Sequence, residues 1–340
     1  MTVSVSPLAS SLDASEGFSA PFWIRSPHLQ TVWGRLVRSR QLVPLRREVI
    51  ETPDGDEMIL DHLDGDGAAR IFILHGLEGS SNSVYVQGLL ALVRARGERA
   101  TVLNFRSCAR DPRNLRTMIP NRKPRFYHSG DTADFDFVVR TLAARAPEER
   151  RVAFGGSLGG NVLLKWLGEH PDQGLLERAA AASVPYDLGA GARQLDASSL
   201  GRFYVGTFLR SLREKARQVV ERFPATGTSL DLERVMRSRT FVEFDDAATA
   251  PLHGFAGADD YYTRSSSLAF LGAIRTPTLC LSAADDPFLP AEALDRARRS
   301  CSQHIRFRIT AHGGHLGFVG GSPLQPHYWA EQAVVAELLR

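Results

Sequence analysis

Short apolar runs alternate with longer amphipathic stretches along most of this chain. Each short run has the length and composition of a buried β-strand, and they lie at residues 70–74, 100–105, 152–154, 179–184, 278–281 and 305–309. The stretches between them repeat their apolar positions with a helical period, as at 86–96, 131–144 and 162–169. This alternation is typical of a mostly parallel sheet with helices on both faces. We therefore expect an α/β fold, whose ligands bind at the carboxyl ends of the strands.

Two regions depart from the alternation. Residues 47–50 and 58–60 flank a turn of Pro53-Asp54-Gly55-Asp56, which predicts an antiparallel hairpin. From about Tyr186 to Ala269 there is no β run, but there are amphipathic stretches such as 203–223. Because this segment lies between two predicted strands, we expect a helical insertion at about 186–269 that covers the sheet.

The N-terminal end differs in composition from the rest. Residues 1–20 are rich in Ser and Ala and are predicted to be a flexible tail, followed by a single domain over 21–340 that carries the insertion. Aromatic residues between Pro21 and Trp33 are expected to pack this arm onto the body of the domain.

Composition and charge exclude several classes of protein. The chain of 340 residues is 43% hydrophobic and 23% charged, and no apolar run approaches the roughly 20 residues of a membrane span. Its 41 basic and 38 acidic residues are interleaved and give a net charge of +3, so a nucleic-acid surface is not expected. Cys108, Cys280 and Cys301 form no CxxC pair, which argues against a disulfide framework or a zinc site. The first twenty residues lack the basic end and apolar run of a signal peptide, so a cytoplasmic location is predicted.

The strongest chemical signal is the sequence Gly155-Gly156-Ser157-Leu158-Gly159, which follows a predicted strand and opens a predicted helix. This is the G-x-S-x-G nucleophile elbow in its strand–turn–helix setting. The small residues allow a tight turn that presents the Ser157 hydroxyl above the sheet, close to the positive end of a helix dipole. Ser157 is therefore the candidate nucleophile.

A serine nucleophile needs a base and an acid that orients the base, and in this fold they follow in the order Ser, Asp, His. Asp285 and Asp286 follow the strand at 278–281, and His312 and His315 follow the next strand. Asp286 is preferred, with Asp285 kept as an alternative. His315 is favoured over His312 because Gly313 and Gly314 allow the loop to carry it toward Ser157. Two histidines three residues apart suggest a metal only weakly, because no further ligand group accompanies them.

The oxyanion hole of such a site consists of backbone N–H groups. The residue after the nucleophile is Leu158, and the loop after the strand at 70–74 offers Leu77 in His75-Gly76-Leu77-Glu78-Gly79-Ser80. His75 is expected to be structural, and no metal or organic cofactor is required.

Several further motifs resemble those of one family. They are His28-Leu29-Gln30-Thr31, the loop from His75 to Ser80, Asn104-Phe105-Arg106, the stretch from Pro124 to Gly130, the elbow through Lys165, Val184-Pro185-Tyr186-Asp187-Leu188, Phe241 to Asp246, His253-Gly254-Phe255, Tyr261-Tyr262, Asp285-Asp286-Pro287-Phe288 and Gly314-His315-Leu316-Gly317-Phe318. With these motifs in order from about Pro21 to Phe318, the chain resembles the YheT/ABHD-type branch of the α/β-hydrolase superfamily.

The resemblance implies an α/β-hydrolase fold with a helical cap and a carboxylic-ester hydrolase with Ser157, Asp286 and His315 as its triad. Its substrate would then be a small-molecule or lipid ester. Animal relatives in this branch act on acylglycerols and phospholipids. An acyltransferase or thioesterase with the same triad is the nearer alternative, and a non-enzymatic binding protein is the more distant one. The sequence departs from the family pattern at Ser107, where Gly is usual, and at Gly156, where Phe is common. Gly156 is expected to open space beside the nucleophile.

The inserted segment offers candidates for the substrate pocket. They are Phe203, Tyr204, Phe208, Tyr261 and Tyr262, although ordinary packing is the better interpretation for any one of them. Arg210, Arg213, Lys215 and Arg217 could meet an anionic membrane, but the nearby Glu214 and Glu221 favour a solvated helix face. The oligomeric state, the acyl chain and the alcohol are not predicted.

Overall fold

The computed structural model describes residues 17–38, 42–225 and 230–340. Sixteen residues of the expected N-terminal tail, 1–16, lie outside this range. A central sheet of eight strands has the order β1-β2-β4-β3-β7-β8-β9-β10. Its strands are β1 (Arg46–Glu51), β2 (Glu57–Leu63), β3 (Ala69–Leu74), β4 (Arg99–Asn104), β7 (Arg150–Gly156), β8 (Arg178–Ala182), β9 (Thr278–Ala283) and β10 (Ile305–Thr310).

Most of this sheet is parallel, as the alternation of strands and helices predicts. Neighbouring strands in the series β4-β3-β7-β8-β9-β10 pair in parallel, whereas β2 pairs antiparallel with both β1 and β4. The hairpin predicted around the Pro53–Asp56 turn is thus β1–β2, and it extends the antiparallel edge of the sheet. The prediction of an α/β fold with a mostly parallel sheet is confirmed.

Helices cover both faces of the sheet, because alternate strand residues point to opposite sides. Phe72 and Leu74 of β3 pack in the core beneath α3 (Ala133–Arg145) and α4 (Leu158–Glu169). Ile71 and Ile73 pack in the core on the other face, beneath α2 (Val84–Ala95) and α12 (Trp329–Leu338). Helix α11 (Ala291–Ser300) joins the first of these cores. Such apolar burial on both faces is the main term that stabilises the sheet.

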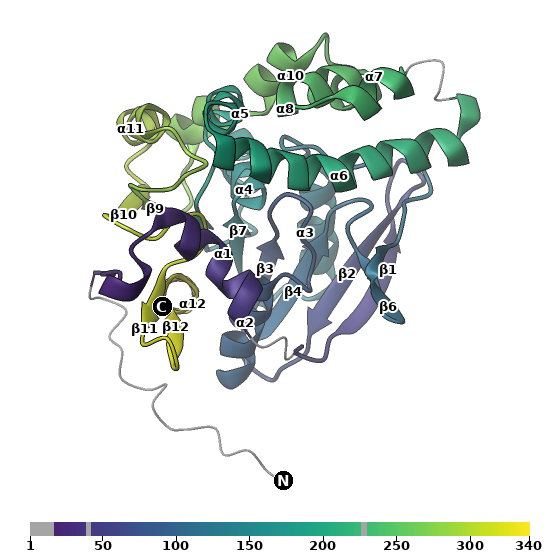
Figure 1. Cartoon of the computed structure of the whole chain (residues 1–340). Helices are drawn as coiled ribbons and strands as arrows, with labels where there is room; N and C mark the ends of the chain where they lie inside the picture. Colours follow the sequence, from purple (N-terminus) through teal and green to yellow (C-terminus); the bar gives the residue numbers. More distant parts are fainter. Residues whose placement is uncertain (1–16, 39–41, 226–229) are drawn as a thin grey trace.

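A group of helices lies between β8 and β9 in the chain and sits over the carboxyl ends of the strands (Figure 1). It consists of α5 (Leu188–Asp196), α6 (Ser199–Arg222), α7 (Leu232–Arg237), α8 (Phe241–Phe244), the π-helical turn Asp245–Thr249, α9 (Ala250–His253), α10 (Ala258–Ser265) and the 3₁₀ segment Ser267–Ala273. The apolar side of α6, including Val205, Leu209 and Leu212, forms a small core with Val235 and Phe244 of this group. We call this group the cap.

The N-terminal arm and two small hairpins complete the described chain. The arm contains the 3₁₀ turn Phe22–Ile24 and α1 (Pro27–Val37), which Ser26 caps and Pro27 begins. The small hairpins are β5 (Arg110–Asp111) with β6 (Asn114–Met118), and β11 (Val319–Gly321) with β12 (Pro326–Tyr328). Because the central sheet takes its strands from residue 46 to 310, we infer that 21–340 form one domain. No helix among the described residues is both long and apolar enough to cross a bilayer.

A buried cluster of charges joins β2, β4 and α3. The Arg106 guanidinium, with only 3% of its side chain exposed, lies 2.7 Å from Asp56 Oδ2, 2.6 Å from Asp134 Oδ1 and 2.9 Å from Asp54 Oδ2. Removing the guanidinium would leave the buried carboxylates of Asp56 and Asp134 without this counter-charge. This lowers the free energy of unfolding far more than the loss of an exposed ion pair does.

We therefore expect Arg106→Met to lower the free energy of unfolding by about 3–5 kcal/mol. The matched control is Arg140→Met, which removes an exposed guanidinium that pairs with Asp136 one helical turn away. The control is expected to cost about 0.5 kcal/mol or less. Urea denaturation of both variants measures the difference, and equal losses would show that the Arg106 cluster is not a structural ion pair.

Candidate active site

Ser157 stands at a tight turn between β7 and α4. Its φ of +53° and ψ of −121° are a conformation that costs a non-glycine residue on the order of 1–3 kcal/mol. The neighbouring glycines permit the turn, because a Cβ on Gly155 would lie 2.4 Å from Gly159 O and one on Gly159 would lie 2.3 Å from Leu74 O. The local sequence thus places the Ser157 side chain at the start of α4, in a conformation that the rest of the fold maintains.

The structure brings Ser157, His315 and Asp286 together in one hydrogen-bonded chain. His315 Nε2 lies 2.8 Å from Ser157 Oγ, and His315 Nδ1 lies 2.9 Å from Asp286 Oδ2. An ionised carboxylate only accepts hydrogen bonds, so Nδ1–H donates to Asp286 and Nε2 is left to accept the Ser157 proton. Asp286 and His315 are both buried, and Asp286 also accepts a hydrogen bond from the Phe288 amide. The Phe288 ring stacks on the imidazole with centroids 4.2 Å apart, which fixes the plane of the imidazole.

The competing pair, Asp285 and His312, lies beside the hydrogen-bonded Ser157–His315–Asp286 triad. It is linked to the triad through the loop that carries His315. Asp285 Oδ2 lies 3.1 Å from His312 Nδ1, and Asp285 Oδ1 accepts from the Gly314 amide at 3.0 Å. His312 is about half exposed on its side chain. The two adjacent carboxylates therefore point in different directions, one to His315 and the other to the loop that carries it.

Helix α1 holds this loop in place, a role that the sequence motif His28-Leu29-Gln30-Thr31 did not reveal. Thr31 Oγ1 accepts a hydrogen bond from the His315 amide at 2.9 Å, and the buried Gln30 amide group exchanges hydrogen bonds with the Val319 backbone. A Cβ on Gly314 would lie 2.4 Å from Pro27 O, so only glycine allows the loop to approach α1 this closely. The spacing between residues 31 and 315 gives no sequence signal for this contact.

The candidate oxyanion amides belong to Leu77 and Leu158, which line a cavity together with Ser157. Neither donates a hydrogen bond to another group in the described part of the chain. Gly76 brings the Leu77 loop against the nucleophile, because a Cβ there would lie 3.2 Å from Ser157 Cβ. His75 supports the loop from below: its Nε2 accepts from the Phe105 amide, and its Nδ1 donates to Gly76 O. Burial lowers the pKa of His75 to about 4, so the ring is neutral at pH 7 and serves as a hydrogen-bonding support.

Lys215 contradicts the prediction of a solvated basic face on α6. Its ammonium is buried, where it contacts Glu78 Oε1 and lies 3.1 Å from Cys108 Sγ and 4.9 Å from the centre of the Tyr127 ring. The helical period turns Lys215 inward while Arg210 and Arg217 stay outward. Burial alone would disfavour the Glu78 carboxylate, but the ammonium outweighs it and lowers the pKa of Glu78. A buried ion pair thus links the cap to the loop that carries Leu77.

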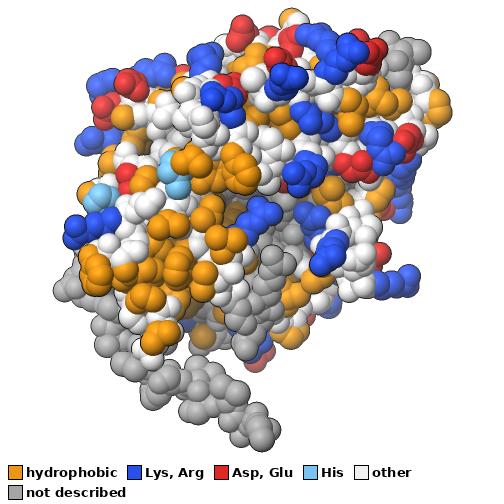
Figure 2. All heavy atoms as spheres, in the orientation of Figure 1, with side chains coloured by type: hydrophobic (Ala, Val, Ile, Leu, Met, Phe, Trp, Pro, Cys, Tyr) orange, Lys and Arg blue, Asp and Glu red, His pale blue; other side chains and the backbone are white. Residues whose placement is uncertain are grey.

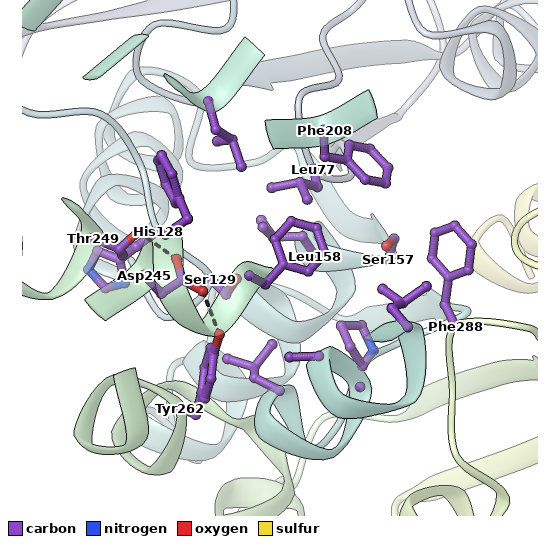
Figure 3. Close-up of a pocket in the computed structure, with 18 of the residues that line it drawn as sticks. Leu77, His128, Ser129, Ser157, Leu158, Phe208, Asp245, Thr249, Tyr262 and Phe288 are labelled. Atoms are coloured by element: carbon purple, nitrogen blue, oxygen red, sulfur yellow. Dashed lines mark hydrogen bonds between the residues drawn. The ribbon is translucent and has the colours of Figure 1, made fainter. Parts of the chain in front are cut away.

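An apolar cavity opens on Ser157 and His315 and extends beneath the cap (Figure 3). Its walls include Leu77, Leu158, Phe208, Phe241 and Phe244. Of the five candidates from the insertion, Phe208, Tyr261 and Tyr262 line this cavity, and Tyr204 lines a neighbouring one. Phe203 lines neither, because it faces outward from α6 with 68% of the residue exposed. The sequence alone does not show that Phe203 lies on the exposed face of α6 while Tyr204 lies on the face toward the cavities.

The far end of the cavity is polar. Figure 3 shows Ser157 at one end and Asp245 with Thr249 and Tyr262 at the other, with Leu158 between. Thr249 Oγ1 and Tyr262 OH donate to the Asp245 carboxylate at 2.6 and 2.7 Å. Burial raises the pKa of Asp245 to about 6 despite these two donors. Sequence reasoning did not assign Asp245 to the pocket, since an acidic residue in a helix is usually exposed.

Gly156 does not leave the extra space beside the nucleophile that the sequence analysis predicts. The Tyr85 ring occupies that space, since a Cβ on Gly156 would lie 3.0 Å from both Cε2 and the hydroxyl of Tyr85. Tyr85 OH accepts a hydrogen bond from the Gly76 amide at 2.7 Å. The small residue before Ser157 is therefore paired with a large residue on α2 that also fixes the start of the Leu77 loop.

A serine at a strand–turn–helix elbow on the carboxyl edge of a mostly parallel sheet defines an α/β hydrolase. The comparisons agree with this class. The chain belongs to the α/β-hydrolase family, whose model, described as alpha/beta hydrolase fold, matches residues 69–322, and within it to the YheT/ABHD branch.

Two relatives represent this branch. The chain is 34% identical over 311 residues to YheT of Escherichia coli (strain K12), which is described as an esterase, with 90% of this chain and 88% of that protein covered. It is 30% identical to the phospholipase ABHD3 of Homo sapiens, with 90% and 75% covered. Among solved structures, the esterase Pf2001 of Pyrococcus furiosus shares the fold with a TM-score of 0.52 at 14% identity, covering 89% of this chain and 91% of that one. The protein is a hydrolase.

Proposed function

We propose that this hydrolase is a serine esterase that cleaves carboxylic esters through an acyl-enzyme on Ser157. The observation that carries the proposal is the hydrogen-bonded chain from Asp286 through His315 to Ser157, at the mouth of an apolar cavity. Both relatives reported above bear names of ester-cleaving enzymes, which supports the same class of substrate.

In the acylation step, His315 Nε2 takes the Ser157 proton as Oγ attacks the ester carbonyl carbon. The carbonyl oxygen becomes an oxyanion, and the unpaired amides of Leu77 and Leu158 are the groups that would donate to it. Asp286 keeps the proton on Nδ1 and stabilises the imidazolium that forms. The ester C–O bond then breaks as Nε2–H gives its proton to the departing alcohol.

Deacylation repeats these roles with water. His315 Nε2 takes a proton from water, whose oxygen attacks the acyl carbon, and then returns a proton to Ser157 Oγ as the carboxylic acid leaves. The apolar walls of the cavity receive the acyl chain, because burial of each methylene contributes about 0.8 kcal/mol.

Hydrolysis of p-nitrophenyl esters of graded acyl length tests the proposal. We expect saturable release of nitrophenol, with kcat/KM rising from acetate to longer acyl chains as apolar area is buried. Product analysis in the presence of added alcohols and thiols distinguishes the alternatives. Acyl transfer to those acceptors in place of hydrolysis would favour an acyltransferase, a marked preference for thioesters would favour a thioesterase, and no turnover of any ester would contradict the proposal.

The Glu78–Lys215 pair gives a prediction that links the cap to catalysis. Lys215→Met leaves the Glu78 carboxylate buried without a counter-charge, so we expect the free energy of unfolding to fall by about 3–5 kcal/mol. Relaxation of Glu78 would move the adjacent Leu77 amide, and loss of one oxyanion donor lowers kcat by roughly 10²-fold or more.

The double variant Glu78→Gln with Lys215→Met removes both charges and is expected to recover most of the lost stability. Urea denaturation and steady-state kinetics on a p-nitrophenyl ester measure the two effects. Unchanged stability and kcat in Lys215→Met would show that the ion pair does not hold the loop.

A further inference from the structure

Three segments that are far apart in the sequence meet beside the active site. They are the N-terminal arm (17–38), the first turns of α6 (198–213) and the loop and hairpin after His315 (316–328). The Trp23 indole N–H donates to Gly321 O at 2.9 Å, which joins the arm to β11. His28 Nδ1 lies 3.2 Å from Tyr204 OH and the two rings stack, which joins α1 to α6. These contacts make one continuous surface, on the near side of the molecule in Figure 1.

This surface is unusually apolar. Eleven large hydrophobic side chains are exposed in the described part of the chain, and seven of them lie in these three segments. We call these seven the apolar face; they are Phe22, Leu29, Leu36, Val37, Leu200, Phe203 and Leu324. Phe22 is 85% exposed and Leu324 is 94% exposed, so neither contributes to the core. Figure 2 shows hydrophobic side chains gathered over the arm, the β11–β12 hairpin and the start of α6. Exposed apolar surface of this kind marks an interaction site.

The charged side chains within the three segments all have one sign. The three segments contain six arginines and no lysine, aspartate or glutamate; the arginines are Arg25, Arg35, Arg38, Arg202, Arg210 and Arg213. Across the whole chain, in contrast, basic and acidic residues number 41 and 38. Arg38 is neutralised by Glu331, but Arg25, Arg35 and Arg210 are exposed. An apolar surface with arginines at its edge is complementary to an anionic lipid bilayer, whose headgroups attract the guanidinium groups while its acyl region receives the apolar side chains.

A second cavity connects this surface to the active site. It is lined by Thr31 and Arg35 of α1, by Arg38 directly after this helix, by Tyr204 of α6 and by His315, and it shares Phe208 and Phe288 with the cavity under the cap. The two cavities therefore meet at His315, one extending beneath the cap and the other lying among the three segments that carry the apolar face.

We propose that the apolar face docks on an anionic lipid bilayer and that the second cavity admits a lipid ester from it to Ser157. The docking is independent of the chemistry, whereas the admission of an ester rests on the proposed esterase function. A second copy of this chain is the less suitable occupant. In a two-fold dimer the same surface would face itself and bring the exposed Arg25, Arg35 and Arg210 of one copy toward those of the other.

The experiment is co-sedimentation of the full chain with vesicles of phosphatidylcholine, with and without phosphatidylglycerol. We expect binding to the anionic vesicles that is at least about tenfold stronger than to the neutral ones and that weakens in high salt. The double variant Phe22→Ser with Leu324→Ser is expected to weaken partition by about tenfold or more, and Arg25→Gln with Arg210→Gln by a similar factor. The control, Leu115→Ser with Met236→Ser, removes two exposed apolar side chains outside the three segments and is expected to bind as the wild type does.

Activity on a water-soluble short-chain ester separates the two proposals. None of the residues substituted in these variants lines either cavity, so this activity should not change. Binding without ester hydrolysis would leave docking intact and contradict the esterase. Three results would overturn docking: no binding to anionic vesicles, equal binding of the face variants and the control, or a dimer in light scattering that the Phe22 and Leu324 substitutions dissociate.

Discussion

Replacing Ser157 by alanine is expected to lower kcat/KM for carboxylic esters by roughly 10⁴- to 10⁶-fold. The hydroxyl is the only group at the mouth of the cavity that His315 Nε2 contacts at hydrogen-bonding distance in the described chain. Without it, the remaining imidazole and the amides of Leu77 and Leu158 can only assist a direct attack by water. The loss should therefore appear in kcat, while binding of a non-hydrolysable ester analogue persists because the apolar walls are unchanged.

Steady-state kinetics on a p-nitrophenyl ester, with the variant and wild type purified in parallel, measure this effect. The variant should unfold within about 1 kcal/mol of the wild type, because Ser157 sits in the same turn with or without its hydroxyl. A folded Ser157→Ala protein that retains more than about one hundredth of the wild-type rate would exclude Ser157 as the nucleophile.

Asp286→Asn is expected to lower kcat by roughly 10³- to 10⁴-fold. The substituted amide group can donate to His315 Nδ1, which favours the tautomer with its proton on Nε2, and that tautomer cannot accept the Ser157 proton. The substitution also removes the negative charge that stabilises the imidazolium. KM should change little, since Asp286 is buried behind the imidazole.

The neighbouring residue supplies a matched control. Asp285→Asn removes an equal charge one residue away, but its amide oxygen can still accept from the Gly314 amide that Asp285 now contacts. We expect kcat to stay within about threefold of the wild type. Comparable losses in the two variants would show that Asp285 and Asp286 act as one unit, and a larger loss in Asp285→Asn would reverse the assignment.

The sequence predicted the fold well because the signals that specify it are local. The β7–turn–α4 elbow is contained in a few residues, and central strands such as β3 and β9 are short apolar runs because they are buried on both faces. The order Ser157, Asp286, His315 could be predicted for a related reason, since each residue follows its own strand directly.

Features that depend on contacts between distant segments could not be predicted. The sequence predicts Lys215 in solvent because Glu214 and Glu221 lie near it on α6, and only the contact with Glu78 shows that its side of the helix is buried. Gly156 was expected to leave space, which Tyr85 fills from another helix. The sequence prefers Asp286 but leaves Asp285 open, because the choice depends on the direction of two adjacent side chains. Thr31 acquires its role only when α1 packs against the His315 loop.

The most direct test of the central claim is labelling with a fluorophosphonate, followed by mass spectrometry of the peptides. We expect one adduct, on Ser157 Oγ, formed by the folded wild-type protein and absent from Ser157→Ala. Labelling should be much slower in Asp286→Asn than in Asp285→Asn. No adduct on the folded wild-type protein, or equal labelling of Ser157→Ala, would contradict an acyl-enzyme mechanism on this serine.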